Sequence, residues 1–290
     1  MSIKKVKVEV SDKNTRLVLK RIYGSDGEYL NRKMAVTNQI RKYEQQRLQY
    51  KKSIFNSKFQ TYHIRWDRAR YWDFNDMDVA KTEAQENDRL FVAQRQMNEK
   101  LWKALNKAQA LNYFEELANK GLSVVTLNVP LKTSIEEWEK ISQDAQSILN
   151  GNQKLMPICS TRHDFALFPE LINDMISKLQ FVGIHSYCLT QPQEILNLTS
   201  LRKANSLIEE GKECPLIFGF NHSRHFSRYS YVNGSFALGC FGVDVYSERQ
   251  YFLENMPTID IDKMMGRSPE EIMFYDTTQG GFNRGEEQEI

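Results

Sequence analysis

Polar side chains capable of chemistry recur in the second half of this sequence, at the points where apolar runs end. Four of the five histidines are among them. Imidazole, hydroxyl and carboxylate groups brought together can move a proton, attack an electrophile or bind a metal ion. The positions concerned are Asn128, Arg162, His163, Asp164, His185, Ser186, Asn221, His222, Ser223, Arg224, His225, Asp244 and Glu248.

These residue types allow more than one kind of site. Imidazoles and carboxylates converging from several strands can hold zinc or manganese, as in barrel hydrolases. The spacings are not diagnostic, and a lone histidine commonly hydrogen-bonds the backbone instead. Arginines at helix N-termini can receive phosphate. The metal set would be His163, Asp164, His185, His222 and Asp244, and the phosphate set Arg162, Arg224 and Arg228.

A repeating rhythm of strands and helices between residues 122 and 248 positions these groups. Ser134-Ile135-Glu136-Glu137 is a capping box that opens one helix, and Gly151 closes it. Helices are also expected at 169–178, 199–210 and 228–238. The expected strands are 122–129, 155–160, 181–186, 215–221 and 241–247.

Strands joined by helical crossovers must run parallel, which makes the fold class α/β. An open doubly wound sheet and a (βα) barrel or partial barrel, TIM-like, both satisfy the pattern, and we expect the barrel. In both architectures ligands bind at the carboxyl ends of the strands.

The first part of the chain follows a different pattern. Residues 3–10 and 16–23 alternate in hydropathy around a polar turn, which predicts a β-hairpin. Residues 32–52 favour a basic helix, and the apolar spacing over 76–120 favours one long helix or two in line. We therefore expect an N-terminal hairpin and basic helical region (1–121), a βα barrel region (122–250) and a C-terminal tail (251–290).

Charge is polarised along the chain. Residues 1–70 hold 18 Lys and Arg against 6 Asp and Glu, a net of +12, although the whole chain carries only +2. A basic segment with interleaved aromatic residues suits nucleic acid, because cations neutralise phosphates while rings stack on bases. The alternative is a solvated helix face that docks on acidic protein surface. The candidate nucleic-acid-binding residues here are Arg41, Lys42, Arg47, Lys51 and Lys52, and Arg224 and Arg228 join them from the later loop.

Composition favours a globular protein, with 41% hydrophobic and 26% charged residues. No apolar leader follows Met1, and no window approaches the length of a membrane span, so we expect a cytoplasmic protein with no membrane partner. Cys159, Cys188, Cys214 and Cys240 include no CxxC pair, which favours buried free thiols over zinc ligands.

Five segments between residues 122 and 247 together resemble the second half of the barrel of the tRNA-guanine transglycosylase family, particularly its archaeal branch and the relatives that place 7-deazaguanines in DNA. Residues 127–130, LNVP, resemble the family's "LDIP", and residues 155–160, LMPICS, lie where the family has "VQGG". Residues 181–186 resemble its "YALGS" strand. Residues 215–222, PLIFGFNH, resemble "PLHLFGAGH", and residues 237–247, ALGCFGVDVYS, resemble "ALGCDLFDS".

The resemblance implies an enzyme in which an aspartate attacks C1′ of a guanosine in DNA or tRNA, guanine leaves, and a 7-deazaguanine-type base replaces it. The family's nucleophile aligns with Ser247, which leaves Asp244 as the expected nucleophile, with Asp73 as a second catalytic candidate. The family's zinc cluster is absent, so no cofactor is expected. The residues expected around the base are Asn128, Cys159, His185, Ser186, Gly219, His222 and Ser247.

Two other functions stay open on the sequence alone. The histidines could belong to a metal-dependent barrel hydrolase. The chain could also be a non-catalytic assembly protein, forming a homo-oligomer or serving as a partner subunit.

Overall fold

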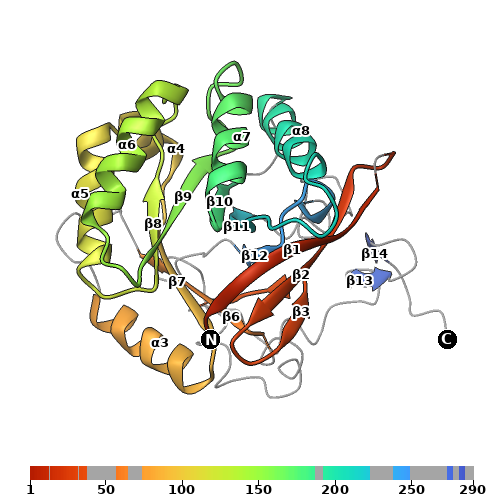
Figure 1. Ribbon diagram of the computed structural model, residues 1–290, viewed down its shortest axis with the longest axis horizontal. Helices are drawn as coiled ribbons and strands as arrows, with labels where there is room; N and C mark the ends of the chain where they lie inside the picture. Colours follow the sequence, from red (N-terminus) through yellow and green to blue (C-terminus); the bar gives the residue numbers. More distant parts are fainter. Residues whose placement is uncertain are drawn as a thin grey trace.

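The computed structural model describes residues 1–12, 14–31, 33–37, 57–64, 74–186, 192–222, 238–248, 273–276 and 281–284. Its elements, in chain order, form an antiparallel N-terminal sheet followed by alternating strands and helices (Figure 1). None of the helices in these ranges is both long enough and apolar enough to cross a membrane.

The strands are β1 (Ile3–Asp12), β2 (Leu17–Gly24), β3 (Glu28–Leu30), β4 (Lys33–Met34), β5 (Val36–Thr37), β6 (Phe59–Ile64), β7 (Leu90–Arg95), β8 (Val124–Asn128), β9 (Lys154–Ser160), β10 (Phe181–His185), β11 (Leu216–His222), β12 (Val245–Glu248), β13 (Met273–Asp276) and β14 (Gly281–Arg284). The helices are α3 (Phe74–Glu86), α4 (Glu99–Ala104), α5 (Lys107–Ala118), α6 (Ile135–Ile148), α7 (Phe168–Lys178) and α8 (Pro192–Ser206). Strands β13 and β14 pair antiparallel.

Seven parallel strands, β6 to β12, lie side by side in chain order and form the main sheet. The prediction of parallel strands joined by helices is confirmed for β8 to β12. Strands β6 and β7 extend the same sheet, so its strands come from both sides of residue 121. Because all seven run the same way, their carboxyl ends meet at one end of the sheet.

The sheet curls until its two edges almost meet. Strand β4 pairs with β12 and strand β5 pairs with β6, and only Ala35 separates β4 from β5 along the chain. The Ala35 N–H donates to the Tyr246 carbonyl at 2.8 Å. The rings of Phe59 on β6 and Phe218 on β11 meet edge to face, with centroids 5.9 Å apart. The result is a nearly closed, barrel-like parallel sheet.

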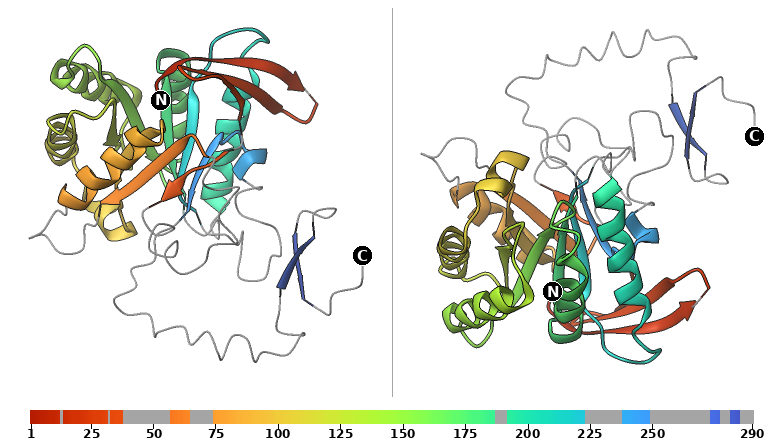
Figure 2. Two further views of the ribbon diagram at one scale, coloured as in Figure 1. Left: turned by 90° about the horizontal axis from the view of Figure 1, so that it is seen from below. Right: turned by 90° about the horizontal axis from the view of Figure 1, so that it is seen from above.

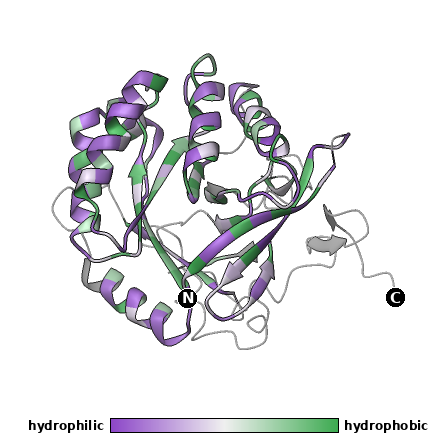
Figure 3. Cartoon of the chain, in the orientation of Figure 1, coloured by the Kyte–Doolittle hydropathy of each residue, from purple (hydrophilic) through white to green (hydrophobic). Residues whose placement is uncertain are grey.

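Helices α5 to α8 pack on the outside of the sheet (Figures 1 and 2). Helix α6 shows how the sequence builds this layer. Ser134 and Glu137 form the expected capping box, and Trp138, Ile141 and Ala145 are buried at helical spacing. Figure 3 shows polar residues on the outer faces of these helices and hydrophobic residues toward the sheet.

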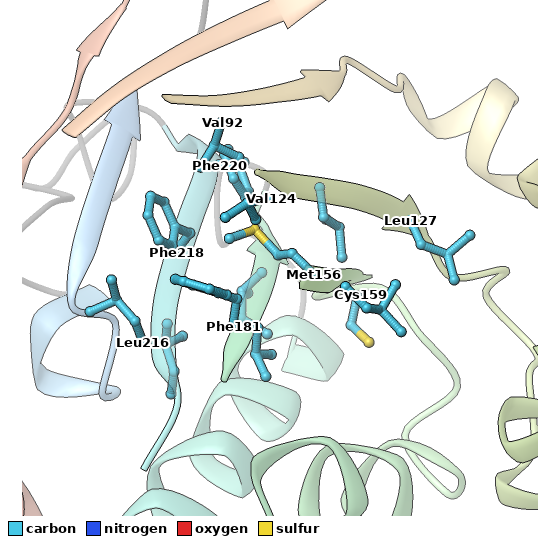
Figure 4. Close-up of a cluster of buried hydrophobic side chains, with 14 of the residues drawn as sticks. Val92, Val124, Leu127, Met156, Cys159, Phe181, Leu216, Phe218 and Phe220 are labelled. Carbon is cyan, nitrogen blue, oxygen red and sulfur yellow. The ribbon is translucent and has the colours of Figure 1, made fainter. Parts of the chain in front are cut away.

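The middle of the barrel-like sheet is filled by large apolar side chains, several of which Figure 4 labels. Phe218 and Phe220 stack with ring centroids 5.9 Å apart. Met156 and Phe181, from β9 and β10, are also buried. This packing resembles the layered interior of parallel barrels, where side chains rather than a channel fill the centre.

The predicted N-terminal hairpin is confirmed, since β1 and β2 pair antiparallel and β3 adds a third strand. It packs beside the segment that leads into β11, because the Val8 N–H donates to the Lys212 carbonyl at 3.0 Å. The hairpin therefore lies at the amino end of the main sheet.

Two helix predictions were wrong. The expected helix over residues 76–120 is interrupted by β7, whose six residues are all buried. A strand buried on both faces is continuously apolar, and such a run fits a helical spacing as well as a strand. The expected basic helix over 32–52 begins instead with β4 and β5, and residues 38–52 lie outside the described residues.

Candidate active site

Polar side chains replace the apolar filling near the carboxyl ends of the strands. Register pairs His63 with Gln94 and Ser160 with His185, so each pair shares one face of the sheet. His185 also pairs with Phe220, whose ring lies 6.4 Å from that of His63 across the interior. These polar residues therefore face inward, in a layer above the aromatic filling.

Asn128 belongs to the same inner layer, at the end of β8. It pairs with Ile158, which pairs with Gly183, which in turn pairs with the interior residue Phe218. The residues of this layer are almost completely buried, Asn128 being the most exposed at 7%. The layer is defined by His63, Gln94, Asn128, Ser160, His185 and Ser247, and we call it the polar layer.

A hydrogen-bonded chain of four side chains crosses from β7 through β6 to β12. Gln94 Nε2 lies 2.9 Å from His63 Nδ1, and His63 Nε2 lies 2.6 Å from Ser247 Oγ. Thr61 Oγ1 lies 2.7 Å from the same Ser247 oxygen. A hydroxyl within hydrogen-bond reach of an imidazole, which a third group orients, is the arrangement used to activate a nucleophile.

The Gln94 amide decides which nitrogen of His63 carries the proton. As placed, Nε2 donates to Nδ1, so the His63 proton lies on Nε2 and faces Ser247. Gln94 Oε1 is buried and has no hydrogen-bond partner among the described residues. A half-turn of the amide would let Oε1 accept from Nδ1–H without loss of another bond, leaving Nε2 to accept the Ser247 proton.

Across the interior, Asn128 offers an unused acceptor. Its Nδ2 donates to the Arg95 carbonyl at 3.3 Å, whereas Oδ1 has no hydrogen-bond partner in the described part of the chain. The His185 ring lies 5.5 Å from the Trp102 ring, edge to face, which brings α4 against the polar layer. Ser186 is also buried here, where its N–H donates to the Phe220 carbonyl at 3.0 Å.

Arg162 is held by carboxylates. Its guanidinium pairs with Glu99 and, through Nε, with Glu194 Oε1 at 3.3 Å. Glu194 is fully buried and also accepts from Thr161 Oγ1 at 3.2 Å. This corrects the expectation that Arg162 is a phosphate receptor, because both carboxylates already occupy it.

Asp244 lies at the opposite end of the sheet from the polar layer. The expected strand 241–247 begins only at Val245, so Asp244 precedes β12 instead of ending it. Its fully buried carboxylate accepts from Lys20 Nζ at 2.8 Å, Asn31 Nδ2 at 2.9 Å and the Ile217 N–H at 2.9 Å. These contacts correct the assignment of Asp244 to the carboxyl-end site and give it a structural role.

Cys159 and Gly219 face away from the interior, which corrects their assignment to the base pocket. Cys159 Sγ lies 3.5 Å from Met175 Sδ on α7, and Figure 4 shows Cys159 beside Leu127. Burial raises the pKa of this thiol well above its usual range. A side chain at Gly219 would meet Val243 Cγ1 at 2.9 Å.

The set of residues proposed for metal does not come together. His163 Nε2 donates to the Thr133 carbonyl at 3.1 Å, Asp164 caps the start of the next turn, and Asp244 lies at the other end of the sheet. Burial lowers the pKa of His163, which favours its neutral form. Over the described ranges, no three His, Cys, Asp or Glu residues are grouped so that they could hold a metal ion.

Several predicted residues fall outside the described part of the chain. They are Asp73, the basic residues Arg41, Lys42, Arg47, Lys51 and Lys52, and the loop residues Arg224 and Arg228. For His222, the structure describes the strand but not the side chain.

Sequence reasoning missed the two residues that complete the chain to Ser247. His63 lies in an aromatic segment whose fold the sequence left open, and Gln94 lies inside the expected long helix. The available signal was the alternation in Phe59–Ile64, where Gln60, Thr61 and His63 interrupt an otherwise apolar strand. No known protein family matches the chain, and no curated protein matches it either.

Proposed function

We propose that the protein is a TIM-type barrel enzyme that exchanges a guanine in nucleic acid for a 7-deazaguanine-type base, with Ser247 as the attacking residue. The observation that carries the proposal is the 2.6 Å contact between Ser247 Oγ and His63 Nε2 in the polar layer. In the resemblance described above, Ser247 occupies the position of the family's nucleophile. It therefore has both the location and a neighbouring base.

The proposed reaction proceeds in two displacements. Ser247 Oγ attacks C1′ of the target nucleoside while its proton passes to His63, and the C1′–N bond to guanine breaks. His63 then gives that proton to the departing guanine. The incoming base loses its own N–H proton, attacks C1′ and releases Ser247, which regains a proton through His63. Atoms and charges balance without a further reactant.

The unpaired acceptor of Asn128 fits recognition of the base. A buried acceptor without a donor costs about 1–3 kcal/mol, which a ligand N–H would recover. Guanine and 7-deazaguanines present ring and amino N–H groups, so Asn128 Oδ1 can accept from either the leaving or the incoming base. A base enters such a pocket only after it is flipped out of its helix.

The decisive experiment measures incorporation of labelled guanine into tRNA and into duplex DNA, side by side. We expect exchange into one of them by the wild-type protein and a drop of at least about 100-fold in Ser247→Ala, the size typical of lost nucleophilic or acid–base catalysis. Asp244→Asn should keep its exchange rate per folded molecule. No exchange into either substrate would refute the proposal.

A trapped adduct distinguishes a covalent route from simple binding. Mixed with oligonucleotide and denatured, the wild-type protein should carry a covalently attached strand on the peptide that contains Ser247, and Ser247→Ala should carry none. Thr61→Val is a matched control because it also removes one hydroxyl contact to Ser247 while leaving the attacking oxygen in place. An adduct that persists in Ser247→Ala would assign the nucleophile elsewhere.

A further inference from the structure

A groove outside the polar layer has the size and lining of a nucleotide site. Its volume is about 570 Å³, within the usual range for ligand pockets. It lies between α4, the start of α5, the loop after β8 and the first turns of α6. Trp102, Leu105 and Ile141 are buried side chains in its lining.

The rest of the lining is mainly cationic. Lys103, Lys107, Lys132 and Lys140 line the groove, against the single carboxylate of Glu137. One oxygen of that carboxylate already accepts from the Ser134 N–H at 3.0 Å, within the cap of α6. An apolar floor with ammonium groups around it matches a ligand that has a flat apolar part and negative charge.

The four lysines are not equivalent. Lys103 and Lys107 each form a 2.8 Å ion pair, with a carboxylate of α4 and of α6 respectively. Lys132 and Lys140 form no ion pair with any residue that the structure describes. These two are exposed ammonium groups beside the groove and are the ones available to an anion.

Trp102 connects the groove to the polar layer. Its ring contacts His185 on one side, and the same side chain lines the groove. Only 1% of the residue is exposed, and its indole N–H has no acceptor among the described residues. A buried donor without an acceptor indicates that a ligand oxygen completes this wall, since orphaned N–H groups are costly.

We propose that this groove binds a phosphate-bearing nucleotide of the nucleic-acid strand, next to the one whose base enters the polar layer. Lys132 and Lys140 contact the phosphates, and the indole lies between the two positions. The assignment rests on the proposed function for the identity of the strand. The charge, the apolar floor and the unpaired donor hold independently of the reaction.

Fluorescence polarisation of a labelled 12-nucleotide single strand, across a series of salt concentrations, tests the groove. We expect Lys132→Ala/Lys140→Ala to bind more weakly at every salt concentration. Its slope of log affinity against log salt should be shallower by about 2, about 1 for each lost phosphate contact. Lys154→Ala/Lys212→Ala is the matched control, because both lysines are exposed at the amino end of the sheet.

Equal slopes for the wild type and Lys132→Ala/Lys140→Ala, or an equal loss in the control, would overturn the proposal. Competition by a free nucleoside monophosphate separates the two sources of the same chemistry. Displacement of the strand at equal concentration would overturn the strand assignment in favour of a free nucleotide; competition weaker by about 100-fold or more supports the strand.

The same measurements separate this inference from the proposed reaction. Ser247→Ala should lose exchange and keep both affinity and salt slope. If the wild type exchanges no base while the groove variants still lose binding, the groove stands and the reaction fails. If exchange occurs and the groove variants bind as the wild type does, the reaction stands and the groove assignment fails.

Discussion

Asp244→Asn should lower stability strongly without changing the chemistry. Asp244 and Lys20 are both completely buried, with Nζ and Oδ2 2.8 Å apart. Removing the charge of one partner leaves a buried ammonium whose other printed contact is the Pro215 carbonyl at 3.0 Å. Breaking a buried pair in this way costs about 3–5 kcal/mol, a large share of the roughly 5–15 kcal/mol that holds a domain folded.

The expected change in melting temperature follows from chain length. An unfolding entropy of about 2.1 cal/mol/K per residue gives about 0.6 kcal/mol/K for 290 residues. A loss of 3–5 kcal/mol therefore lowers Tm by about 5–8 °C, measurable by circular dichroism. Asp78→Asn is the control, because its 3.5 Å pair with Lys120 is solvent-exposed and contributes at most about 1 kcal/mol.

A double-mutant cycle shows whether the pair itself is responsible. Lys20→Met and Asp244→Asn should each destabilise the protein, and the double variant should lose about 1–3 kcal/mol less than the two single losses combined. Additive losses, or an Asp244→Asn protein with unchanged Tm, would refute the reasoning. A stable Asp244→Asn protein that forms no covalent adduct would return the nucleophile to Asp244.

Three further predictions concern single buried groups. Because burial lowers the pKa of His163 below 6.5, the unfolded chain takes up a proton that the folded chain does not; stability should fall as pH drops below about 6.5, and urea unfolding of His163→Gln should show a slope shallower by up to one proton. Burial raises the pKa of Cys159 and Cys214, the latter to about 12, so iodoacetamide at about pH 8 should label neither until urea is added; labelling in the native protein would contradict their burial. Ser134→Ala should cost about 1 kcal/mol by removing the cap of α6, and an unchanged unfolding free energy would count against that cap.

The sequence predicted the parts of the fold whose signals are local. The capping box at Ser134 defined the start of α6, and short apolar runs bounded by polar residues located β8 to β11 within two residues. Successive strands separated by helices also predicted a parallel sheet correctly. Each of these inferences used residues within one element or its immediate neighbours.

The rest depended on contacts between distant segments. Strands β4 and β5 have two residues each, and nothing local distinguishes them; their pairing with β12 and β6 identifies them. His63 and Gln94 became site residues only because β6 and β7 carry them into the same interior as Ser247. The Lys20 contact to Asp244 spans 224 positions, beyond the reach of any spacing rule.

The spacing of Asp244 and Ser247 explains how one segment can serve both stability and chemistry. Residues three apart in a strand lie about 10 Å apart and on opposite faces. Asp244 is thereby directed to Lys20 at the amino end, while Ser247 faces His63 in the polar layer. A motif with two acidic residues at this spacing has one position for each task. In this chain the structural position keeps its aspartate, and the interior position has a serine with an imidazole beside it, which is why Ser247 rather than Asp244 is the residue to test for attack on a substrate.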